Sequence, residues 1–531
     1  MNTHLAFFVA FREFDNLGIG YLASVLSEAG YEYMIIDFQT GKKEILNTLQ
    51  NKKPLIVGFS VIFQYHIYEF KELITYLRKG GINCHFTAGG NYASLRYNEL
   101  FETIPALDSI VRFEGEYTFL ELFKCLQSGE DWKKIKSIAF KNEGLLIANP
   151  LRPLEKNLDN FPFPIRSAPK EYALDKKFAT ILAGRGCLYE CLFCNVREFY
   201  KQLSGSKKRI RNPEMVVLEM EQLYFQKGCS IFLFQDDDFP VRTEEGSTWI
   251  KAFCRELKRK DLINKIMWKI NCRPDEIDHD SFALMKDHGL FLAFLGIEDG
   301  TDSGLKRLNK HMTAAKCREG INILKRLDIG FDYGFMLFQP ATTFGSVCDN
   351  LDFLREICGD GYSAVTFLKM LPYFETRIEK QLRDEGRLKG KPGFLDYDFL
   401  DGSMNHYYNF ITDGLSDWLR DSDGLLNVLK WARNYMSVFL HYFNLTPEVS
   451  IISKDIIKTT SDSNIFLLDT MKELVPLFES GKYNSGNYKD LSGYREDINI
   501  KHSHFIEQIN NSMDKLLHIV DRQKIAKLVL W

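Results

Sequence analysis

The stretch FATILAGRGCLYECLFCN, residues 178–195, joins an apolar run to three closely spaced cysteines. Its first part, residues 178–184, predicts a buried β-strand, and the cysteines follow in the next loop. Cys187, Cys191 and Cys194 have the spacing C-x3-C-x2-C. Thiolates at this spacing can bind three irons of a 4Fe–4S cluster, while the fourth iron has no protein ligand. Because an open iron is a reaction site, the stretch predicts a cluster that takes part in chemistry.

A structural zinc site is the main alternative for these cysteines. Such a site needs four protein ligands, often arranged as two close pairs. The other eight of the eleven cysteines are scattered singly, and the nearest are Cys229 and Cys254. Ordinary buried cysteines are common in proteins, but three at this spacing directly after a strand are not expected by chance. The pattern therefore favours an iron–sulfur cluster.

Strand and helix patterns continue beyond the cysteine loop and predict a partial (β/α)6 barrel over residues 176–395. Helical patterns separate the apolar runs, and such a barrel places its chemistry at the C-terminal ends of the strands. Asp236, Arg273 and Glu298 fall at such ends. The strand candidates after 178–184 are 230–239, 266–273, 290–299, 331–338 and 363–372.

Residues 1–140 show a second alternation of strands and helices. It predicts a doubly wound, Rossmann-like sheet of the flavodoxin type. Ligands bind such sheets at the C-terminal strand ends. Residues 141–175, with five prolines, predict a linker, and 396–531 predict a mainly helical domain. The strand candidates of the first domain are 5–11, 33–38, 55–63, 83–90 and 109–116.

Composition narrows the class of protein further. The chain has 531 residues, 45% of them hydrophobic and 26% charged, which is typical of a globular protein with large cores. Its net charge of −3 and the lack of a basic stripe predict no nucleic-acid partner. No apolar run approaches the roughly 18 residues of a membrane span. The odd cysteine count and the absence of a signal-peptide pattern predict a cytoplasmic protein.

The cysteine motif, its place after a first barrel strand and the later strand-end residues resemble the radical S-adenosylmethionine (radical SAM) enzymes. In that family the open iron binds SAM, and an electron from the cluster cleaves it to a 5′-deoxyadenosyl radical. The radical then removes a hydrogen atom from the substrate. The resemblance implies that Phe193 lies near the adenine and that Asp236, Arg273 and Glu298 contact SAM.

Two segments of the barrel can be compared with that family in detail. GIEDGTDSGLKRLNK, residues 296–310, closely resembles the segment after the fourth strand, although Asp299 stands where serine is more usual. The family more often has a Gly-Pro-Gly-Glu-Thr-like turn where this chain has Gln-Pro-Ala-Thr-Thr at 339–343. The expected glutamate is therefore missing from this turn.

The first domain resembles the cobalamin-binding domain that precedes many radical SAM barrels. The resemblance rests on an ordered set of segments: NLGIGYLASVLSEAGYEYMIID (16–37), VGFSVIF (57–63), TAGGNYAS (87–94) and VRFEGEYTFLELF (111–123). It implies cobalamin contacts from Leu17, Gly18, Ser60, Gly89, Gly90 and Glu116. The chain lacks an Asp-x-His-x-x-Gly loop, so bound cobalamin is expected to have no histidine ligand from the protein. His66 and His85 are interpreted as surface or satisfied histidines. A flavodoxin-like domain without a retained ligand is the alternative.

The resemblance implies a cobalamin-dependent radical SAM C-methyltransferase that uses the 5′-deoxyadenosyl radical and methylcobalamin on an unactivated carbon. The alternatives are a rearrangement, ring contraction or cyclisation with the same cofactors, and a cobalamin- or redox-sensing protein with a structural cluster. A methylthiotransferase is disfavoured because only Cys84 and Cys125 are available in the first domain. Expected partners are a small-molecule or peptide substrate and an electron donor such as flavodoxin or ferredoxin.

Overall fold

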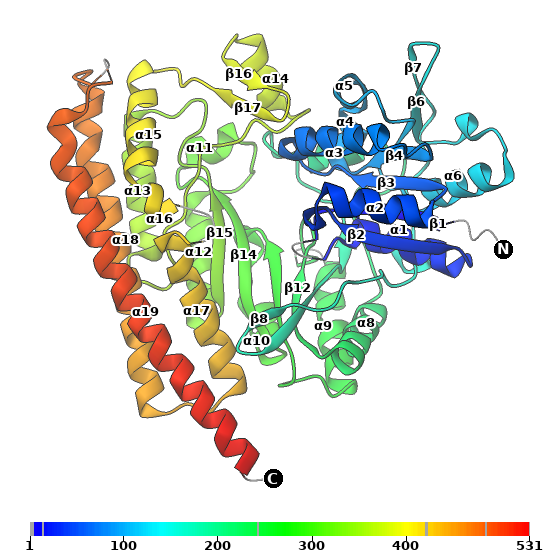
Figure 1. The fold of residues 1–531 in the computed structure, drawn as a ribbon. Coiled ribbons are helices and arrows are strands. Elements are labelled where there is room, and N and C mark those ends of the chain that lie inside the picture. Colours follow the sequence, from blue (N-terminus) through cyan, green and yellow to red (C-terminus); the bar gives the residue numbers. More distant parts are fainter. Residues whose placement is uncertain (1–4, 13–14, 242–243, 420–422, 484–485, 530–531) are drawn as a thin grey trace. The chain divides into compact units, whose positions relative to one another are not determined.

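The computed structural model describes residues 5–12, 15–241, 244–419, 423–483 and 486–529; side chains at 244–246 and 525–529 are outside the description. The chain forms two compact units, and Figure 1 shows their elements. The first unit contains Met1–Pro169, Ala179–Glu219 and Leu371–Tyr397; the second contains Lys170–Phe178, Met220–Met370 and Asp398–Trp531. The chain therefore leaves the first unit and returns to it twice. The boundaries at 140, 175 and 395 stay predictions.

The first unit is built on a seven-stranded sheet with the order β2-β1-β3-β4-β5-β6-β7. The first five strands are parallel, and their order 2-1-3-4-5 is that of flavodoxin-like folds. This confirms the predicted Rossmann-like sheet. The strands are β1 (Leu5–Ala10), β2 (Glu32–Asp37), β3 (Ile56–Ser60), β4 (His85–Gly89), β5 (Ser109–Val111), β6 (Ile138–Asn142) and β7 (Leu145–Ala148).

The stretch predicted as a linker begins with structure of its own. Strand β6 ends and β7 lies inside residues 141–148, and the two form a hairpin that pairs antiparallel with β5. The helices of the first unit are α1 (Leu17–Glu28), α2 (Lys42–Lys52), α3 (Ile67–Lys79), α4 (Asn91–Leu95), α5 (Tyr97–Thr103), α6 (Glu116–Ser128), α7 (Val196–Lys201) and α14 (Arg377–Asp384).

Strand β1 shows why this sheet has helices on both faces. All six of its residues are buried. Successive side chains point to opposite faces, so Phe7 packs in the core with Phe59 and Phe86, whereas Phe8 packs in the opposite core with Phe119. A strand that is apolar throughout is stable only between two covering layers.

The second unit contains a curled sheet with the order β15-β14-β13-β12-β9-β8. Strands β12 to β15 are parallel, and β8 is antiparallel to β9. This half-barrel confirms the predicted fold class. The strands are β8 (Glu171–Ala173), β9 (Lys176–Ile181, of which the residues up to Phe178 belong to the second unit), β12 (Cys229–Phe234), β13 (Met267–Cys272), β14 (Leu290–Glu298) and β15 (Gly330–Phe335).

The sixth predicted barrel strand, 363–372, is wrong as a continuous strand. It contributes one parallel bridge, between Phe338 and Lys369. Side chains take up backbone groups that a ladder would use: Val365 N donates to Asn464 Oδ1 at 2.9 Å, and Thr366 N donates to the Tyr333 hydroxyl at 3.2 Å. The apolar run therefore packs against the sheet end without forming a regular strand.

Helices cover the half-barrel, and the C-terminal region is helical as predicted, apart from 420–422, 484–485 and 530–531, which lie outside the described residues. Helix α18 packs against α13, α15 and α19, and Figure 1 shows these long helices side by side. The helices are α9 (Glu244–Arg259), α10 (His279–Asp287), α11 (Asp302–Arg307), α12 (Ala314–Arg326), α13 (Phe344–Cys358), α15 (Gly402–Gly414), α16 (Ser416–Leu419), α17 (Leu425–Tyr442), α18 (Pro447–Glu479) and α19 (Ser492–Val529), with α8 (Pro213–Lys227) shared between the units.

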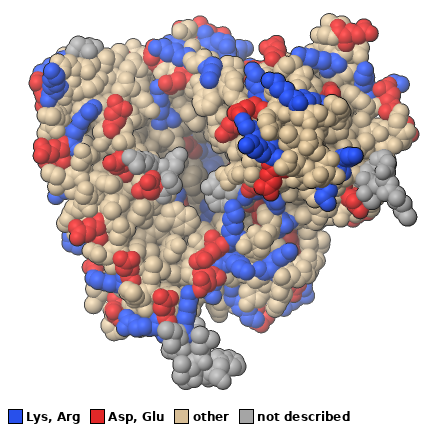
Figure 2. Space-filling view, in the orientation of Figure 1, with Lys and Arg blue, Asp and Glu red and all other residues tan. Residues whose placement is uncertain are grey.

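The surface carries both signs of charge. Figure 2 shows Lys and Arg side chains interspersed with Asp and Glu over the face that is drawn. Across the described residues, no helix combines the length and the apolar character that crossing a membrane requires.

Candidate cofactor sites

A short ladder holds the base of the cysteine loop in the first unit. Strand β10 (Gly184–Arg185) pairs antiparallel with β11 (Arg209–Ile210) and closes the loop between them. Gly186 has φ +85°, and a Cβ there would lie 1.8 Å from the carbonyl oxygen of Lys207. Only glycine fits such a position without moving the backbone. The glycine before the first cysteine is therefore required by the loop closure.

The three cysteines lie in this loop, outside any disulfide and partly exposed. Cys194 N donates to Cys191 O at 3.3 Å, so the last two share one turn. Among the described residues, no three His, Cys, Asp or Glu side chains are grouped around a single ion position. A 4Fe–4S cluster does not require this, because its cysteines bind different irons. Three thiols in one loop fit such a cluster.

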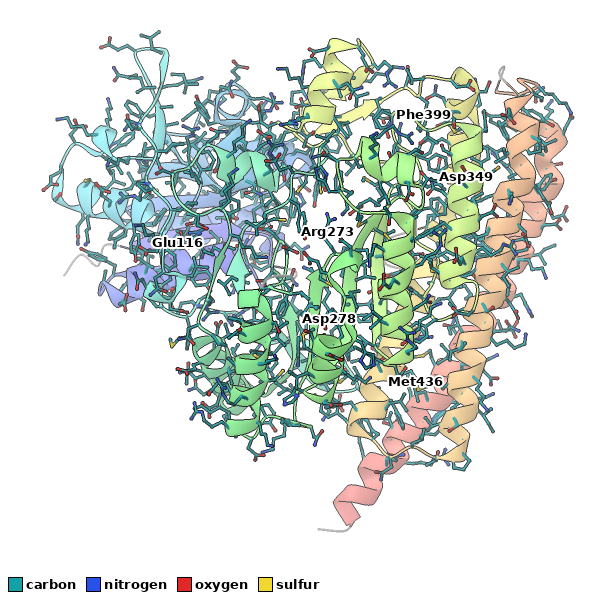
Figure 3. All side chains as sticks on the ribbon, turned by 180° about the vertical axis from the view of Figure 1, so that it is seen from behind. Glu116, Arg273, Asp278, Asp349, Phe399 and Met436 are labelled. Carbon is teal, nitrogen blue, oxygen red and sulfur yellow. The ribbon has the colours of Figure 1, made fainter. Side chains whose placement is uncertain are left out.

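The ladder is held by charges from the turn after β5. Arg185 contacts Glu116 at 2.8 Å and Glu114 at 3.5 Å, and Arg209 donates to Glu114 at 3.0 Å. Burial by itself lowers the pKa of Arg185, but Glu116 and Glu114 outweigh it and raise the pKa above its usual value. Glu116, labelled in Figure 3, is thus paired with the arginine that precedes the cysteine motif. Its predicted contact with cobalamin stays a prediction.

Three of the candidate cobalamin residues, Leu17, Gly18 and Ser60, lie at the carboxyl ends of β1 and β3. These neighbouring strands form the switch point at which flavodoxin-like sheets bind ligands. Leu17 and Gly18 begin α1, and Asn16 caps that helix by accepting from Ile19 N at 3.0 Å. Asn16 Nδ2 also donates to Ser60 Oγ at 3.3 Å. One asparagine therefore ties the turn of Leu17 and Gly18 to Ser60.

Gly89 and Gly90 follow β4 at the same edge. Gly90 has φ +108°, and a Cβ there would lie 2.7 Å from Val61 O. Val61 N donates to Gly89 O at 2.7 Å, so the backbones after β3 and β4 touch. This close approach requires a residue without a side chain. The small residues leave bare backbone for a bulky ligand, which fits a cobalamin-binding edge.

An aromatic pair follows Ser60 and was missed by the sequence patterns. Phe63 and Tyr65 stack with ring centroids 5.2 Å apart and planes 8° apart, yet they are 44% and 40% exposed. The two rings lie beside the candidate cobalamin edge and add an exposed apolar surface to it. The apolar run 55–63 was the sequence signal that could have revealed the pair. The whole run was predicted as a strand, whereas β3 ends at Ser60 and leaves the rest of the run in the following loop.

Two histidines of this domain lie among the described residues, and both have protein partners. His66 pairs with Glu69 and stacks on Phe11 at 3.9 Å. His85 lies 2.8 Å from Ser109 Oγ, and burial lowers the pKa of His85 to about 4. Both agree with the prediction that they are satisfied.

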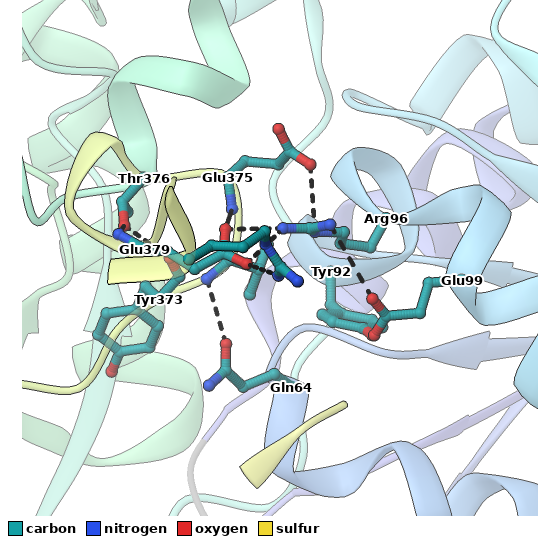
Figure 4. A network of polar contacts seen from close by, with 10 residues as sticks. Gln64, Tyr92, Arg96, Glu99, Tyr373, Glu375, Thr376 and Glu379 are labelled. Carbon is teal, nitrogen blue, oxygen red and sulfur yellow. Dashed lines mark hydrogen bonds and ion pairs between the residues drawn. The ribbon is translucent and has the colours of Figure 1, made fainter. Parts of the chain in front are cut away.

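A segment from after the half-barrel secures the loop of the aromatic pair (Figure 4). Arg96 contacts Glu379 at 2.7 Å and Glu375 at 3.1 Å. Gln64, between the two exposed rings, accepts from Phe374 N at 3.2 Å. Residues 371–397 therefore pack beside the candidate cobalamin edge of the first unit, although they follow the half-barrel in sequence.

Phe193 is partly exposed in the cysteine loop of the first unit, whereas the other candidate SAM residues belong to the second unit. Of the three aspartates after β12, Asp236 and Asp238 are buried and Asp237 is exposed. Alternation of side chains along an extended backbone explains this pattern. The carbonyl of Asp236 accepts from Asn271 Nδ2 at 3.0 Å, which ties this turn to β13.

Glu298 and Arg273 meet at Lys310 in the second unit. Glu298 lies 3.7 Å from Lys310 Nζ. Burial raises the pKa of Glu298, and Lys310 acts in the opposite direction. Arg273, labelled in Figure 3, pairs with Asp275 at 2.9 Å and donates to Lys310 O at 2.5 Å. The structure thus brings both predicted residues together; their contact with SAM stays a prediction.

The two departures from the family pattern contact each other. Gln339 Nε2 donates to Asp299 Oδ2 at 2.7 Å. Asp299 also accepts from Thr301 N at 2.8 Å and thereby shapes the start of α11. Burial raises the pKa of Asp299. An aspartate in place of serine and a glutamine in the next turn therefore form one matched pair that joins the ends of β14 and β15.

Ionisable side chains that the motifs did not indicate lie on the sheet face of Glu298. In register, Asn271 is beside Phe294, and Phe294 is beside Asp332. Lys269 lies two residues before Asn271 and donates to its Oδ1 at 2.6 Å. Burial lowers the pKa of Lys269 to about 8. The sequence signal that could have indicated Lys269 is the alternation of side chains along β13, in which Lys269 and Asn271 are less buried than their neighbours.

Comparison with protein families agrees with the candidate cobalamin edge and with the cysteine loop and half-barrel. Residues 5–123 match the B12 binding domain, and residues 181–354 match the Radical SAM superfamily. The chain therefore carries a radical SAM domain preceded by a B12-binding domain. It is a cobalamin-dependent radical SAM enzyme, which confirms the predicted 4Fe–4S cluster, SAM and cobalamin as its cofactors.

Individual relatives have different activities. An anaerobic magnesium-protoporphyrin IX monomethyl ester cyclase of Cereibacter sphaeroides is 27% identical over 74% of this chain and 66% of its own length. An uncharacterized methyltransferase of Pyrococcus horikoshii is 25% identical over 68% of this chain and 77% of its own length. The match to the cyclase thus spans slightly less than two thirds of that protein.

Solved structures share the fold. The cobalamin-dependent radical enzyme OxsB with aqua-cobalamin and SAM bound has a TM-score of 0.70 and 17% identity, over 99% of this chain and 80% of that one. The radical SAM methyltransferase TsrM from Kitasatospora setae has a TM-score of 0.62 and 18% identity, over 73% of this chain and 79% of that one.

Proposed function

We propose that this enzyme is a C-methyltransferase that acts on an unactivated carbon of a biosynthetic intermediate or a peptide. The observation that carries the proposal is the presence of two cofactor sites in one chain. One is the edge at Ser60 and Gly90, and the other is the loop of Cys187, Cys191 and Cys194. Relatives named as methyltransferases support it.

When bound, the cluster and SAM supply the radical and cobalamin supplies the methyl group, so the protein has to hold and shield these groups. Cys187, Cys191 and Cys194 would hold the cluster. Gly90 and Ser60 would admit cobalamin close to the backbone, with the rings of Phe63 and Tyr65 beside it. No histidine ligand is proposed for cobalt, because the chain lacks an Asp-x-His-x-x-Gly loop and the two described histidines of the domain, His66 and His85, have protein partners.

Residues of the second unit would orient SAM and the substrate. Glu298, whose raised pKa reflects burial, would hold a polar group of SAM, and Arg273 would neutralise a carboxylate. On the same face, Lys269 and Asp332 would bind an ionised group of the substrate. Asp332 also pairs with Lys430 at 3.2 Å, so its carboxylate already has a cationic partner.

A cyclisation or other rearrangement with the same cofactors is the second candidate. It is favoured by the relative named as an anaerobic cyclase. A small-molecule or peptide substrate, a flavodoxin or ferredoxin as electron donor and a cytoplasmic location complete the proposal.

An anaerobic assay with the full chain, SAM and a reductant tests the proposal. Radical chemistry requires 5′-deoxyadenosine, and methyl transfer requires S-adenosylhomocysteine in addition. We expect Cys191→Ala to lose cluster iron and 5′-deoxyadenosine by more than about tenfold, because one cluster ligand is removed. Cys348→Ala, a cysteine of α13, is the matched control and should retain both.

The possible products separate the candidates. 5′-Deoxyadenosine without S-adenosylhomocysteine would exclude methylation and favour the rearrangement. The absence of 5′-deoxyadenosine from an iron-loaded preparation would refute both. A visible-spectrum titration with hydroxocobalamin tests the cobalamin edge independently of turnover.

A further inference from the structure

The second unit has a cavity of about 360 Å³ at the amino ends of three of its parallel strands. Met267, Leu290 and Gly330, the first residues of β13, β14 and β15, line it. Arg273 follows the last residue of β13. Figure 3 shows Arg273 and the cavity residue Met436 at opposite ends of the strands. The cavity is thus separate from the candidate SAM residues.

The walls combine an apolar body with a few polar groups, as ligand pockets do. Helix α17 contributes most of one wall, and α10 and α18 contribute others. The apolar side chains include Phe291, Met436, Leu440, Ile456 and Ile457. The polar side chains are Lys286, Asp328, Tyr362, Arg433, Ser437, His441 and Ser453.

The fixed charges of the lining are two cations and one carboxylate. Lys286 Nζ donates to the backbone oxygen of Asp328, and Arg433 donates to Gly361 O at 3.0 Å and lies over the Tyr362 ring. Within the described part of the chain, neither Lys286 nor Arg433 forms an ion pair. Burial lowers the pKa of Arg433, which nearby acidic groups only partly offset. A partly buried guanidinium of this kind is stabilised by an anion.

His441 adds a further polar group to the same wall. Its Nε2 is buried and has no hydrogen-bond partner among the described residues. Burial, together with the charge of Lys286, lowers the pKa of His441, so the ring is neutral near pH 7. An unpaired buried nitrogen is costly. A ligand in the cavity would provide its missing partner.

We propose that this cavity binds a small anion, a carboxylate or a phosphate attached to a short apolar body, as a regulatory ligand. Arg433 and Lys286 hold the charged group, and the apolar lining holds the body. The ligand acts from the far end of the sheet through α17. This helix carries Arg433 one turn after Lys430, which pairs with Asp332 on the inner sheet face. The proposal does not depend on which reaction the enzyme catalyses.

Calorimetric titration of the full chain with four probes that share one body tests this proposal. Octanoate and octyl phosphate are anionic, octan-1-ol is neutral and octylammonium is cationic. We expect both anions to bind at least about tenfold more tightly than the alcohol, because a hydrogen-bonded charge contributes this much. A preference between the two anions identifies the head group.

Variants locate the binding. Arg433→Met should weaken octanoate or octyl phosphate binding by about tenfold or more. Arg255→Met, an exposed arginine of α9, is the matched control. Ser453→Phe, which fills the cavity without changing charge, should abolish binding and decides the question if Arg433→Met does not fold. Equal binding of octan-1-ol and octanoate, or wild-type binding by Ser453→Phe, would overturn the proposal.

Discussion

At the residue scale, the environment changes the chemistry of side chains that look ordinary in the sequence. Lys269 is one lysine among many in the sequence. In the structure it lies on the face of Glu298, next to Asn271. Burial is the largest cause of its low pKa, Lys430 lowers it further, and Asp332 raises it. No periodic pattern reports the charges that set this pKa, because Asp332 and Lys430 are distant from Lys269 in sequence.

The first prediction concerns the charge of Lys269. Its acetylation by acetic anhydride, followed by mass spectrometry, should be half-maximal near pH 8, because only the neutral amine reacts and the pKa is about 8. Lys430→Met removes a neighbouring positive charge and should move the midpoint to higher pH. Asp332→Asn should move it to lower pH. A wild-type midpoint near 10.4, the value of an ordinary lysine, would contradict this prediction.

The second prediction concerns the pair Asp299 and Gln339. Gln339→Ala leaves a buried carboxylate without one of its donors, and Asp299→Ser leaves a buried amide without its acceptor. Each should lower the free energy of unfolding by about 1–3 kcal/mol. The double variant should lose less free energy of unfolding than the sum of the two single losses. Urea denaturation of the full chain, followed by a spectroscopic signal of the second unit, measures all three values. Additive losses would show that the contact is not an energetic pair.

At the element scale, strand ends and the turns after them form the candidate sites. The sequence patterns located most of these ends, because buried parallel strands have apolar runs that stop where the ligand edge begins. The patterns placed the strand end wrongly in residues 55–63 and predicted a continuous strand wrongly in residues 363–372. In the first case the run continued into exposed rings, and in the second side chains of Asn464 and Tyr333 replaced a strand ladder.

The third prediction tests the turn after β4, where Gly90 meets the backbone that follows β3. Gly90→Ala should reduce hydroxocobalamin affinity by about tenfold or more, because the new Cβ meets Val61 O at 2.7 Å in addition to the strain of φ +108°. Gly81→Ala has a similar φ of +84° and open space around it, so it controls for strain alone. Visible-spectrum titration gives both affinities. Equal affinities for the two variants would count against a ligand edge at Gly90.

At the scale of the whole molecule, the chain builds each unit from separate pieces. The segment Leu371–Tyr397 follows the half-barrel yet belongs to the first unit. Arg96 and Gln64 hold it there through Glu379, Glu375 and the backbone of Phe374. The linker composition of 141–175 was visible in the sequence, but this second return was not, because its contacts join residues almost three hundred positions apart.

The fourth prediction tests this return. Arg96→Met removes one of the two arginine partners of the buried carboxylate of Glu379, while Arg383 remains at 2.6 Å, so the expected cost is about 1–3 kcal/mol. Hydrogen exchange of residues 373–383 should therefore become faster. Arg377→Met, an exposed arginine on the same helix, should leave it unchanged. Unaltered exchange in Arg96→Met would mean that the apolar contact of Phe374 holds the segment without the ion pairs.

The sequence by itself predicted the two α/β domains and three candidate cluster cysteines, and its resemblance to a family implied SAM and cobalamin. The domains and the cysteine motif are visible in local patterns: periodic apolar residues, and three thiols within one loop. Only the tertiary structure decided that Glu116 pairs with Arg185, that Asp299 pairs with Gln339 and that residues 371–397 return to the first unit. Such contacts gain their energy only when distant segments are buried together, so no local pattern contains them.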